Sequence, residues 1–256
     1  MSAVVLCYHG ISETWPAPTT VTPDRFERQL AWLAKRGYRA ATLSEALTAA
    51  PALRTVVISF DDAHRSVLEL ALPLLDAHGF VATVFAPTDY VDSGALMGWD
   101  GYDIWLGTPH EHELTPMSWQ ELGGLVEKGW EVGSHTLSHP HLPEVEDDER
   151  LAAELGESRA RCAERLGVPC PTLAYPYGDH DLGVRRTALA AGYSVAVTMP
   201  TATEPPLPLA WPRVGVYRDD DVRRLRLRIW RRSLPFRPGI GARVLEKAFA
   251  LRGGRA

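Results

Sequence analysis

The stretch Thr55-Val-Val-Ile-Ser-Phe-Asp-Asp-Ala-His-Arg-Ser66 decides the fold that we expect for this chain. Its apolar run predicts a short buried strand, which ends in two adjacent carboxylates, Asp61 and Asp62. At the carboxyl end of a strand in an α/β protein, such residues lie on the face where ligands and catalytic groups gather. The alternative is a strand-to-helix turn in which an acid caps the following helix.

Around this strand the chain repeats one unit, a helix-like stretch that ends at a glycine and precedes a strand. Glycine suits the left-handed residue just past a helix. The five helix ends are Gly37, Gly79, Gly129, Gly167 and Gly192. The strands that we expect are residues 4–7, 56–59, 82–86, 130–134, 172–174, 194–198 and 213–217. Seven strands alternating with helices predict an α/β fold with a parallel sheet, closed or nearly closed into a barrel. An open doubly wound sheet is the alternative.

Helix starts and one long loop complete the expected organisation. Thr22 before Pro23, Ser118 with Glu121 as a capping box, and Asp147 or Asp148 predict helix N-termini. Residues 88–116, rich in glycine, aromatic and acidic residues, have no helical period and predict a long loop over the active face. Its aromatic residues either stack on sugars or pack on the barrel.

Composition favours one large α/β domain in a reducing compartment. The chain has 256 residues, of which 45% are hydrophobic, and its three cysteines have no disulfide or metal-finger spacing. No window offers the roughly 20 apolar residues of a membrane span. The first residues lack the basic region of a signal peptide. Taking Met1 as the start, we therefore expect a cytoplasmic protein.

The charge is distributed unevenly along the chain. Residues 223–255 carry eleven Lys or Arg and one acid, in a protein whose net charge is −5. We therefore divide the chain into a barrel, residues 1–218, and a basic C-terminal extension, residues 219–256. The amphipathic helix Arg223–Arg232 either contacts an anionic leaflet at the inner membrane face or docks on the acidic barrel. A second helix is expected around residues 244–251. Nucleic acid is not an expected partner, because no recognition fold accompanies the charge.

Polar residues follow the ends of several expected strands, so they should meet at one rim. His135 and His139 are separated by three residues, a spacing that places two imidazoles on one side of a helical turn. A carboxylate from a neighbouring strand end would complete a two-His-one-Asp site for a divalent cation. The alternative is a pair of surface or core histidines.

Three of these motifs resemble those of the polysaccharide deacetylases, carbohydrate esterase family four. They are Ser59-Phe-Asp-Asp62, His135-Thr-Leu-Ser-His139 and Tyr175-Pro-Tyr-Gly178. Leu6-Cys-Tyr-His-Gly10 and Pro212-Arg-Val-Gly-Val216 resemble the subgroup of bacterial poly-N-acetylglucosamine deacetylases, in which the motif order is permuted. The resemblance spans residues 4–217. It implies a distorted (β/α)7 barrel, a divalent metal, usually Zn²⁺ with Co²⁺, Ni²⁺ or Mn²⁺ as alternatives, and hydrolysis of an N-acetyl group on an amino sugar.

The resemblance, together with the chemistry, suggests a role for each residue. Asp62, His135 and His139 would hold the metal. Asp61 would be the general base, because the side chains of consecutive residues at a strand end diverge. The backbone N–H of Tyr177 would donate to the tetrahedral oxyanion.

The chain departs from the family pattern in two places. The family's late Leu-x-His motif, which supplies the general acid, is absent; His9 is our candidate, with His180 or a purely structural histidine as alternatives. Ala174 stands where the family has an arginine that orients the base. Arg213 would supply that charge and lower the pKa of Asp61, unless it forms a surface ion pair.

We therefore expect a metal-dependent deacetylase acting on an N-acetylated amino sugar that is free, lipid-linked or part of a glycan conjugate. A deformylase or an O-deacetylase would use the same site. The alternative from another class is a non-catalytic carbohydrate-binding or membrane-peripheral protein.

Overall fold

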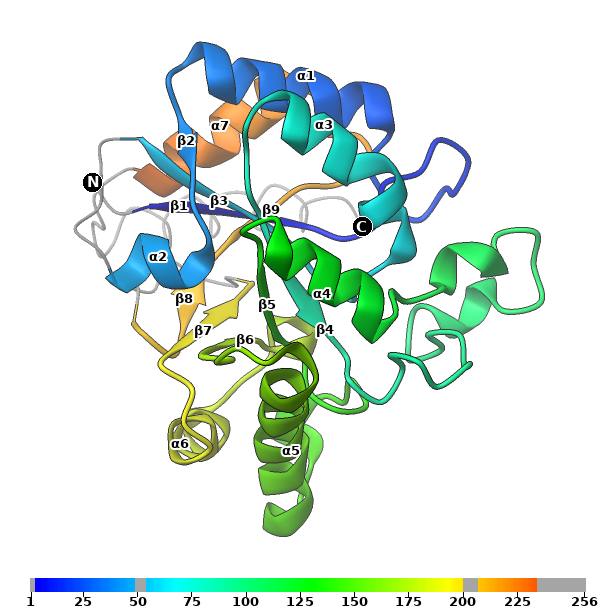
Figure 1. The fold of residues 1–256 in the computed structure, drawn as a ribbon, viewed down its shortest axis with the longest axis vertical. Coiled ribbons are helices and arrows are strands. Elements are labelled where there is room, and N and C mark those ends of the chain that lie inside the picture. The colour runs from blue at the N-terminus through cyan, green and yellow to red at the C-terminus, as the bar shows by residue number, and fades with distance from the viewer. Residues whose placement is uncertain (1–2, 49–53, 200–206, 234–256) are drawn as a thin grey trace, which may run out of the picture.

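The computed structural model describes residues 3–48, 54–199 and 207–233, and in them strands alternate with helices (Figure 1). The strands are β1 (Val4–Tyr8), β2 (Arg39–Ala40), β3 (Thr55–Phe60), β4 (Thr83–Ala86), β5 (Glu131–Ser134), β6 (Thr172–Ala174), β7 (Val195–Thr198), β8 (Trp211–Pro212) and β9 (Val214–Gly215). The helices are α1 (Pro23–Lys35), α2 (Leu43–Thr48), α3 (Leu72–Ala77), α4 (Trp119–Glu127), α5 (Asp148–Leu166), α6 (Leu182–Ala190) and α7 (Val222–Ser233).

All strands belong to one parallel sheet, in the order β8-β7-β6-β5-β4-β3-β1-β9, with β2 paired to β3. β8 and β9 are consecutive in the chain and separated only by Arg213, yet β8 pairs with β7 and β9 pairs with β1. The segment 211–215 therefore joins both edges of the sheet and closes it into a distorted barrel. The barrel prediction is confirmed, and the open doubly wound alternative is wrong.

The seven expected strands are all present, and the last is shorter than expected, since only Val214–Gly215 pairs as a strand. β2 and β8 were not expected, because two-residue strands carry no periodic signal.

Alternate residues of the strands face opposite sides of the barrel wall. Leu6, Ile58 and Val84 point outward into the main core beneath the helices. Val5, Val57 and Phe85 point inward and fill the barrel with other small apolar residues. In Figure 1, α1, α3 and α7 lie over β1 and β3, and α5 and α6 lie over the β5–β7 side. The barrel interior is thus a packed core that supports the rim above it.

The helix starts follow the expected chemistry. The Thr22 side chain caps α1, Ser118 and Glu121 form the capping box of α4, and Asp147 caps α5. α5 ends at Gly167, whose φ of 67° lies in the left-handed region that glycine adopts without strain.

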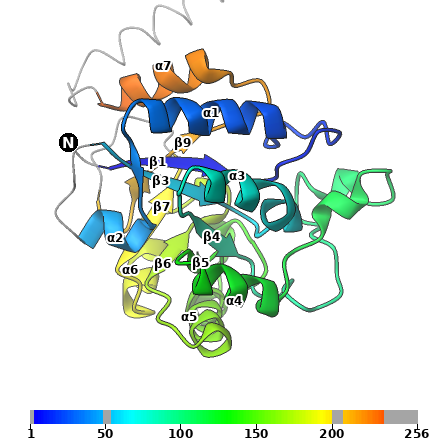
Figure 2. The same cartoon turned by 45° about the horizontal axis from the view of Figure 1, so that its top comes forward.

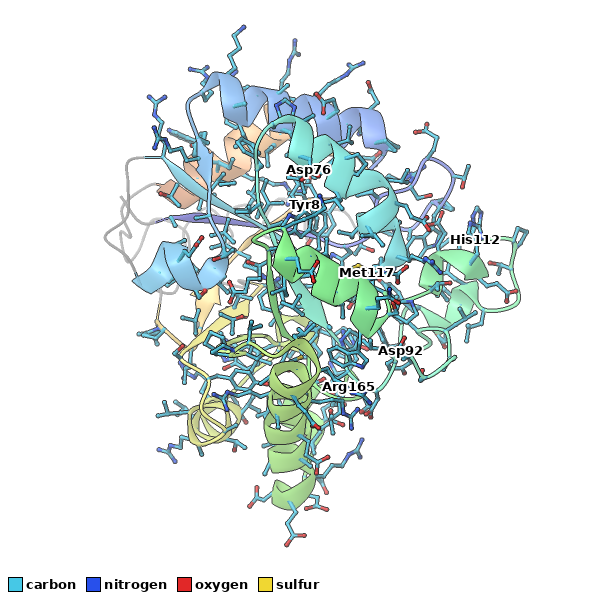
Figure 3. All side chains as sticks on the ribbon, viewed as in Figure 1. Tyr8, Asp76, Asp92, His112, Met117 and Arg165 are labelled. Atoms are coloured by element: carbon cyan, nitrogen blue, oxygen red, sulfur yellow. The ribbon has the colours of Figure 1, made fainter. Side chains whose placement is uncertain are left out.

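The long loop after β4 has structure of its own. It contains two short 3-10 turns, Asp103–Trp105 and Glu111–Leu114, within the expected long loop. Its buried side chains form a separate cluster around Trp15 and Tyr102. Asp92 fixes the first part of the loop to α4 by accepting a hydrogen bond from the backbone N–H of Trp119 at 3.2 Å (Figure 3). The loop therefore packs on the barrel as a fixed lobe beside the rim.

The basic helix is present as α7 and lies beside α1 (Figure 2). Its Leu225 and Ile229 are buried in the main core, and Arg228 pairs with buried Asp220 at 3.1 Å. One face of α7 is thus docked on the barrel. The helix expected around residues 244–251 lies outside the described residues, and the division at residue 218 stays a prediction. Within residues 3–48, 54–199 and 207–233, no helix combines the length and apolarity that a membrane crossing needs.

Gly133 tests the close packing inside the barrel. A Cβ at this position would lie 2.6 Å from Phe85 Cε1 and 2.6 Å from Thr172 Oγ1. We expect Gly133→Ala to lower the free energy of unfolding by about 1–3 kcal/mol, because the interior would be overpacked. Gly124→Ala, in exposed α4 with no atom within 4 Å of the new Cβ, should instead stabilise by up to about 1 kcal/mol. Urea unfolding measures both, and equal stability of the two variants would contradict the packed interior.

Candidate metal centre and active site

Asp62, His135 and His139 meet at the rim, although they come from two different loops. Asp62 Oδ1 lies 3.3 Å from His135 Nε2 and 3.6 Å from His139 Nε2. All three residues are buried, and one ligand atom from each lies within 4.8 Å of the others. The geometry is therefore that of a facial set of one carboxylate and two imidazoles.

The loop that carries the two histidines is not the helical turn that their spacing suggested. Thr136 and His139 both have left-handed backbones, with φ of 69° and 63°. Such conformations cost about 1–3 kcal/mol each in a residue other than glycine and persist only where the surroundings hold them. Buried Glu154 on α5 does so by accepting the backbone N–H groups of Leu137 and Ser138, both at 3.0 Å. The expectation of a helical turn was wrong, but both imidazoles still reach one point.

Each imidazole is oriented by a neighbour. His135 Nδ1 lies 2.8 Å from the carbonyl oxygen of Ala174, which can only accept, so Nδ1 carries the proton and Nε2 faces Asp62. The His139 ring stacks on Trp99, with centroids 4.0 Å apart and planes at 19°. Burial and the nearby charge of His135 lower the pKa of His139 to about 3. His139 is therefore neutral at ordinary pH, as a metal ligand must be.

These residues fit a divalent cation. Asp62 Oδ1 is buried without a hydrogen-bond partner among the described residues, an expensive state for a carboxylate oxygen. Burial alone would raise the pKa of Asp62, but its attraction to the His135 and His64 imidazoles outweighs burial and holds this pKa well below its usual value. Ligand atoms at the usual distances from tetrahedral zinc lie about 3.4 Å apart, close to the observed separations. The carboxylate and imidazole donors suit Zn²⁺, Co²⁺, Ni²⁺ or Mn²⁺.

The second oxygen of Asp62 is held by two residues that the sequence analysis did not assign to the site. Tyr102 donates its hydroxyl to Asp62 Oδ2 at 2.7 Å, and His64 Nε2 lies 3.5 Å from the same oxygen. His64 Nε2 is also 2.9 Å from the Tyr102 hydroxyl, and its Nδ1 is 2.9 Å from the Glu113 carbonyl oxygen. His64 stands two residues after Asp62 and was detectable in the motif, but no local signal marks Tyr102.

Asp61 lies beside the triad and is bound by Arg213. Arg213 Nη1 and Nη2 donate to the two carboxylate oxygens of Asp61, both at 2.6 Å, and both side chains are buried. The expected pairing is thus present as an internal ion pair and not a surface one. Burial would raise the pKa of Asp61, but the guanidinium outweighs burial and lowers the pKa to about 2. Cys7, expected in the core, is buried below, with Sγ 3.5 Å from Asp61 Oδ2.

His9 and Tyr177 lie on either side of these groups. His9 Nε2 is 4.0 Å from Asp61 Oδ2, and 22% of its side chain is exposed. Burial lowers the pKa of His9. Tyr177 has a left-handed backbone, with φ of 57°, in the turn Pro176–Gly178. Its ring lies between His139 and His141, with its centroid 3.7 Å from that of His141.

The remaining polar and aromatic candidates separate into rim and packing residues. His180 packs against Tyr175, with ring centroids 5.0 Å apart, away from the triad. Tyr102 and Trp105 belong to the cluster inside the long loop, whereas Trp211 packs on the barrel interior. Trp99 stacks on His139 and Tyr102 donates to Asp62, so both of these aromatic residues of the loop contact the triad.

Arg213 tests the electrostatics of the site. Arg213→Met leaves the Asp61 carboxylate buried and unpaired, which should cost about 3–5 kcal/mol of unfolding free energy at neutral pH. The wild-type pKa of Asp61 is about 2, below its ordinary 3.8, so the ion pair stabilises fully above about pH 4 and its contribution is lost as the pH falls through 2. The deficit of the variant should therefore shrink in acid. Urea unfolding across pH measures it, and Arg213→Met combined with Asp61→Asn should recover part of the loss. An acid-independent deficit would count against the pair.

Tyr102 tests the support of Asp62. Removing the hydroxyl in Tyr102→Phe should weaken zinc binding about 10- to 100-fold, as loss of a hydrogen bond to a metal-ligating group does. Tyr193→Phe is the matched control, because its hydroxyl donates to the Leu155 carbonyl at 2.8 Å, away from the triad. Titration calorimetry with zinc should show an unchanged affinity for the control. Equal affinities for both variants would remove Tyr102 from the metal site.

A family model for polysaccharide deacetylases matches residues 49–196. A putative polysaccharide deacetylase of Bacillus subtilis is 27% identical over 206 residues, which cover 78% of this chain and 64% of the relative. A poly-beta-1,6-N-acetyl-D-glucosamine N-deacetylase of Staphylococcus aureus is 27% identical over 192 residues, 69% of this chain and 61% of the relative. The chain thus spans less than two thirds of the length of these curated relatives.

Solved structures share the fold. The deacetylase PplD of Streptococcus pyogenes, in complex with acetate, has a TM-score of 0.73 at 20% identity, over 89% of this chain and 97% of its own. IcaB of Ammonifex degensii has a TM-score of 0.73 at 23% identity, over 91% and 97%. Since the family model covers more than half of the chain and the motifs occur in the expected order, the chain belongs to the polysaccharide deacetylase family.

Proposed function

We propose that the chain is a metal-dependent hydrolase that removes the N-acetyl group from an amino sugar. The main support for this proposal is that two neighbouring carboxylates at the rim have different surroundings. Asp62 faces two imidazoles, whereas Asp61 faces a guanidinium. One acid is therefore suited to holding a cation and the other to accepting a proton.

Asp62, His135 and His139 would hold the divalent cation, with Zn²⁺ as our choice. Such a cation lowers the pKa of bound water and polarises the acetyl carbonyl. The buried position of the triad excludes bulk water, and its hydrogen-bonded neighbours hold Asp62 and His135 in place. Burial would lower the pKa of His135, but its contact with Asp62 outweighs burial and raises this pKa. A cation would therefore compete with a proton for His135.

Asp61 is the proposed general base. The two hydrogen bonds from Arg213 fix both carboxylate oxygens, and the low pKa keeps the group ionised throughout the ordinary pH range. Arg213 makes the carboxylate a weaker base, but it also fixes the direction from which a proton is accepted. Arg213 is therefore the proposed positioning residue, in place of the arginine that the family places at Ala174.

His9 and Tyr177 complete the proposed chemistry. His9 lies next to Asp61 and is partly exposed, so it can reach a leaving amine at the rim. A histidine whose pKa is lowered releases its proton readily once charged, which suits a general acid. The left-handed backbone of Tyr177, after Pro176, supports the assignment of its N–H group to a developing oxyanion.

The proposed substrate is an N-acetylated amino sugar, free, lipid-linked or part of a glycan conjugate. Trp99, Tyr177 and His141 are partly exposed aromatic residues beside the triad, and aromatic rings bind the apolar faces of sugars. The name of the Staphylococcus aureus relative specifies a poly-N-acetylglucosamine, which makes N-acetylglucosamine oligomers the first substrates to test.

Acetate release from N-acetylglucosamine oligomers and small conjugates tests the proposal. We expect zinc-loaded protein to release acetate and Asp61→Asn to lower kcat by about 10²–10⁴-fold while keeping one equivalent of zinc, because only the proton acceptor is lost. Asp62→Asn should lose zinc and activity together. Asp76→Asn, the same chemical change at an exposed carboxylate on α3, is the control.

The same assay separates the alternatives. Release of formate, or of acetate from O-acetyl esters alone, would replace the proposal by a deformylase or an O-deacetylase. Stoichiometric zinc without release from any amide or ester would favour a non-catalytic carbohydrate-binding protein.

A further inference from the structure

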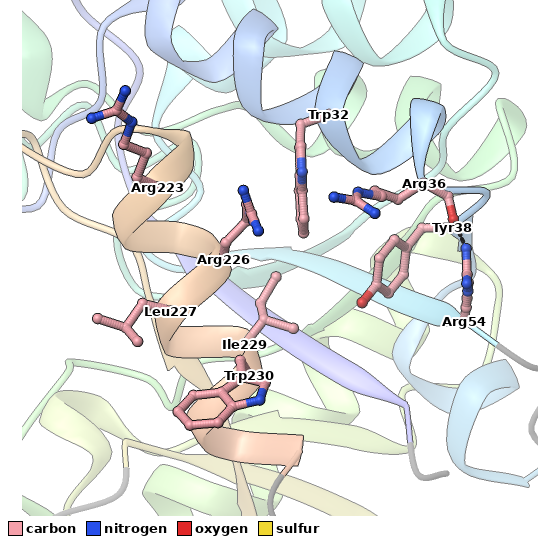
Figure 4. Close-up of a pocket in the computed structure, with 9 residues that line it drawn as sticks. All are labelled: Trp32, Arg36, Tyr38, Arg54, Arg223, Arg226, Leu227, Ile229 and Trp230. Atoms are coloured by element: carbon pink, nitrogen blue, oxygen red, sulfur yellow. Dashed lines mark hydrogen bonds between the residues drawn. The ribbon is translucent and has the colours of Figure 1, made fainter.

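A basic groove lies between α1 and α7, on the outside of the barrel (Figure 4). We call it the α1–α7 groove. It encloses about 630 Å³, and four arginines and several aromatic or aliphatic side chains line it. The lining residues that matter here are Arg36, Arg54, Arg223, Arg226, Trp32 and Trp230. No carboxylate is among the lining residues of this cavity, although the protein as a whole is acidic.

Among the described residues, none of the four guanidinium groups lies within ion-pair distance of a carboxylate, and the charge of Arg223 is felt only by exposed Asp221. Within the described part of the chain, ion pairs to carboxylates are formed by other arginines, for example Arg228 and Arg213. Arg54 donates instead to the backbone carbonyl of Arg36 (Figure 4). Asp221, at the start of α7, accepts from the backbone N–H of Arg224 at 2.8 Å. The groove is therefore a local site of positive charge that an anionic molecule could neutralise.

The groove also exposes apolar surface. Trp230 is 58% exposed and Leu227 is 44% exposed, while Leu225 and Ile229, which pack in the main core, are buried. A helix with one docked apolar face and a second face of arginine, tryptophan and leucine is typical of segments that lie in the interface of a membrane. Tryptophan in particular favours the headgroup region, where one end of the ring is apolar and the other is wet.

We infer that the α1–α7 groove docks this protein on an anionic phospholipid surface. Headgroup phosphates would pair with Arg36, Arg54 and Arg226, and Trp230 with Leu227 would insert between the lipids. Free phosphate or nucleic acid would satisfy the charges but would leave the apolar side chains without a partner. The chain beyond residue 233 carries five Lys or Arg and one acid, so its composition adds positive charge and little counter-charge.

The structure also shows which arginines of the basic helix face the groove and are free to contact lipid. Arg228 is held by Asp220 and lies over the Tyr217 ring at 5.0 Å, so it belongs to the docked face. The sequence predicted membrane contact through the whole helix Arg223–Arg232. The inferred contact involves only the outer face of this helix and adds Arg36 and Arg54 from neighbouring segments.

Docking at this groove would leave the rim open. Arg54 comes directly before β3, and the site residues Asp61 and Asp62 come directly after it. A six-residue strand spans about 20 Å, so groove and site lie near opposite ends of β3. The inference does not depend on the proposed hydrolysis, and its test needs no substrate.

Vesicle flotation with the full chain tests the inference. We expect binding to vesicles of phosphatidylcholine with phosphatidylglycerol and none to phosphatidylcholine alone. Arg36→Gln and Arg226→Gln should each weaken partitioning about five-fold, because a basic residue near an anionic surface contributes about that factor. Trp230→Ser should also weaken binding. Arg186→Gln, the same change at an exposed residue of α6, is the matched control and should bind as wild type.

All of the substituted residues of the groove are exposed, so circular dichroism should show that each variant folds as wild type. If Arg36→Gln and Arg226→Gln partition onto vesicles as strongly as wild type, the inference is overturned and any binding belongs to other basic residues. Displacement from vesicles by inorganic phosphate at constant ionic strength would replace the lipid surface by a small anion. Displacement by duplex DNA at the same ionic strength would replace it by nucleic acid.

Discussion

The ion pair between Arg213 and Asp61 is the interaction on which the rest of the site depends. Arg213 interrupts β8 and β9, the two short strands that join the edges of the barrel, and its side chain points inward to the end of β3. One buried guanidinium therefore links the closure of the barrel to the orientation of a carboxylate. A buried charge pair is not in itself a strong source of stability, because desolvation offsets most of the attraction. Its value here is geometric, since neither charge can move without leaving the other unpaired.

The second constraint is the strained backbone around the triad. Asp62, Thr136, His139 and Tyr177 all adopt left-handed conformations. Such conformations are uncommon outside glycine, and here they occur at residues that face a common point. The closed barrel and the hydrogen bonds of Glu154 and Tyr102 hold them there. The strained backbone thus lowers the stability of the fold, but it directs the three side chains of the triad toward one another in the absence of a ligand.

Much of this arrangement could be predicted from the sequence, because its signals are local. Buried strands, helix caps and the two motifs of the triad each depend on a few consecutive residues. The spacing of His135 and His139 indicated convergence correctly but suggested the wrong backbone, since a helical turn and a strained loop can bring the same two side chains together. Tyr102 could not be predicted, because it lies 40 positions after Asp62 and its contact depends on how the intervening residues fold.

The basic helix shows the same limit of sequence patterns. Its arginines are indistinguishable in the sequence, yet Arg228 is turned toward Asp220 and Arg226 toward solvent. Only the docking of Leu225 and Ile229 in the core decides which face remains outside. Once that face is fixed, the basic groove and the rim with the triad lie near opposite ends of β3. A surface bound at one end then has no steric reason to obstruct a ligand at the other, so the proposed attachment and the proposed hydrolysis should respond to different substitutions.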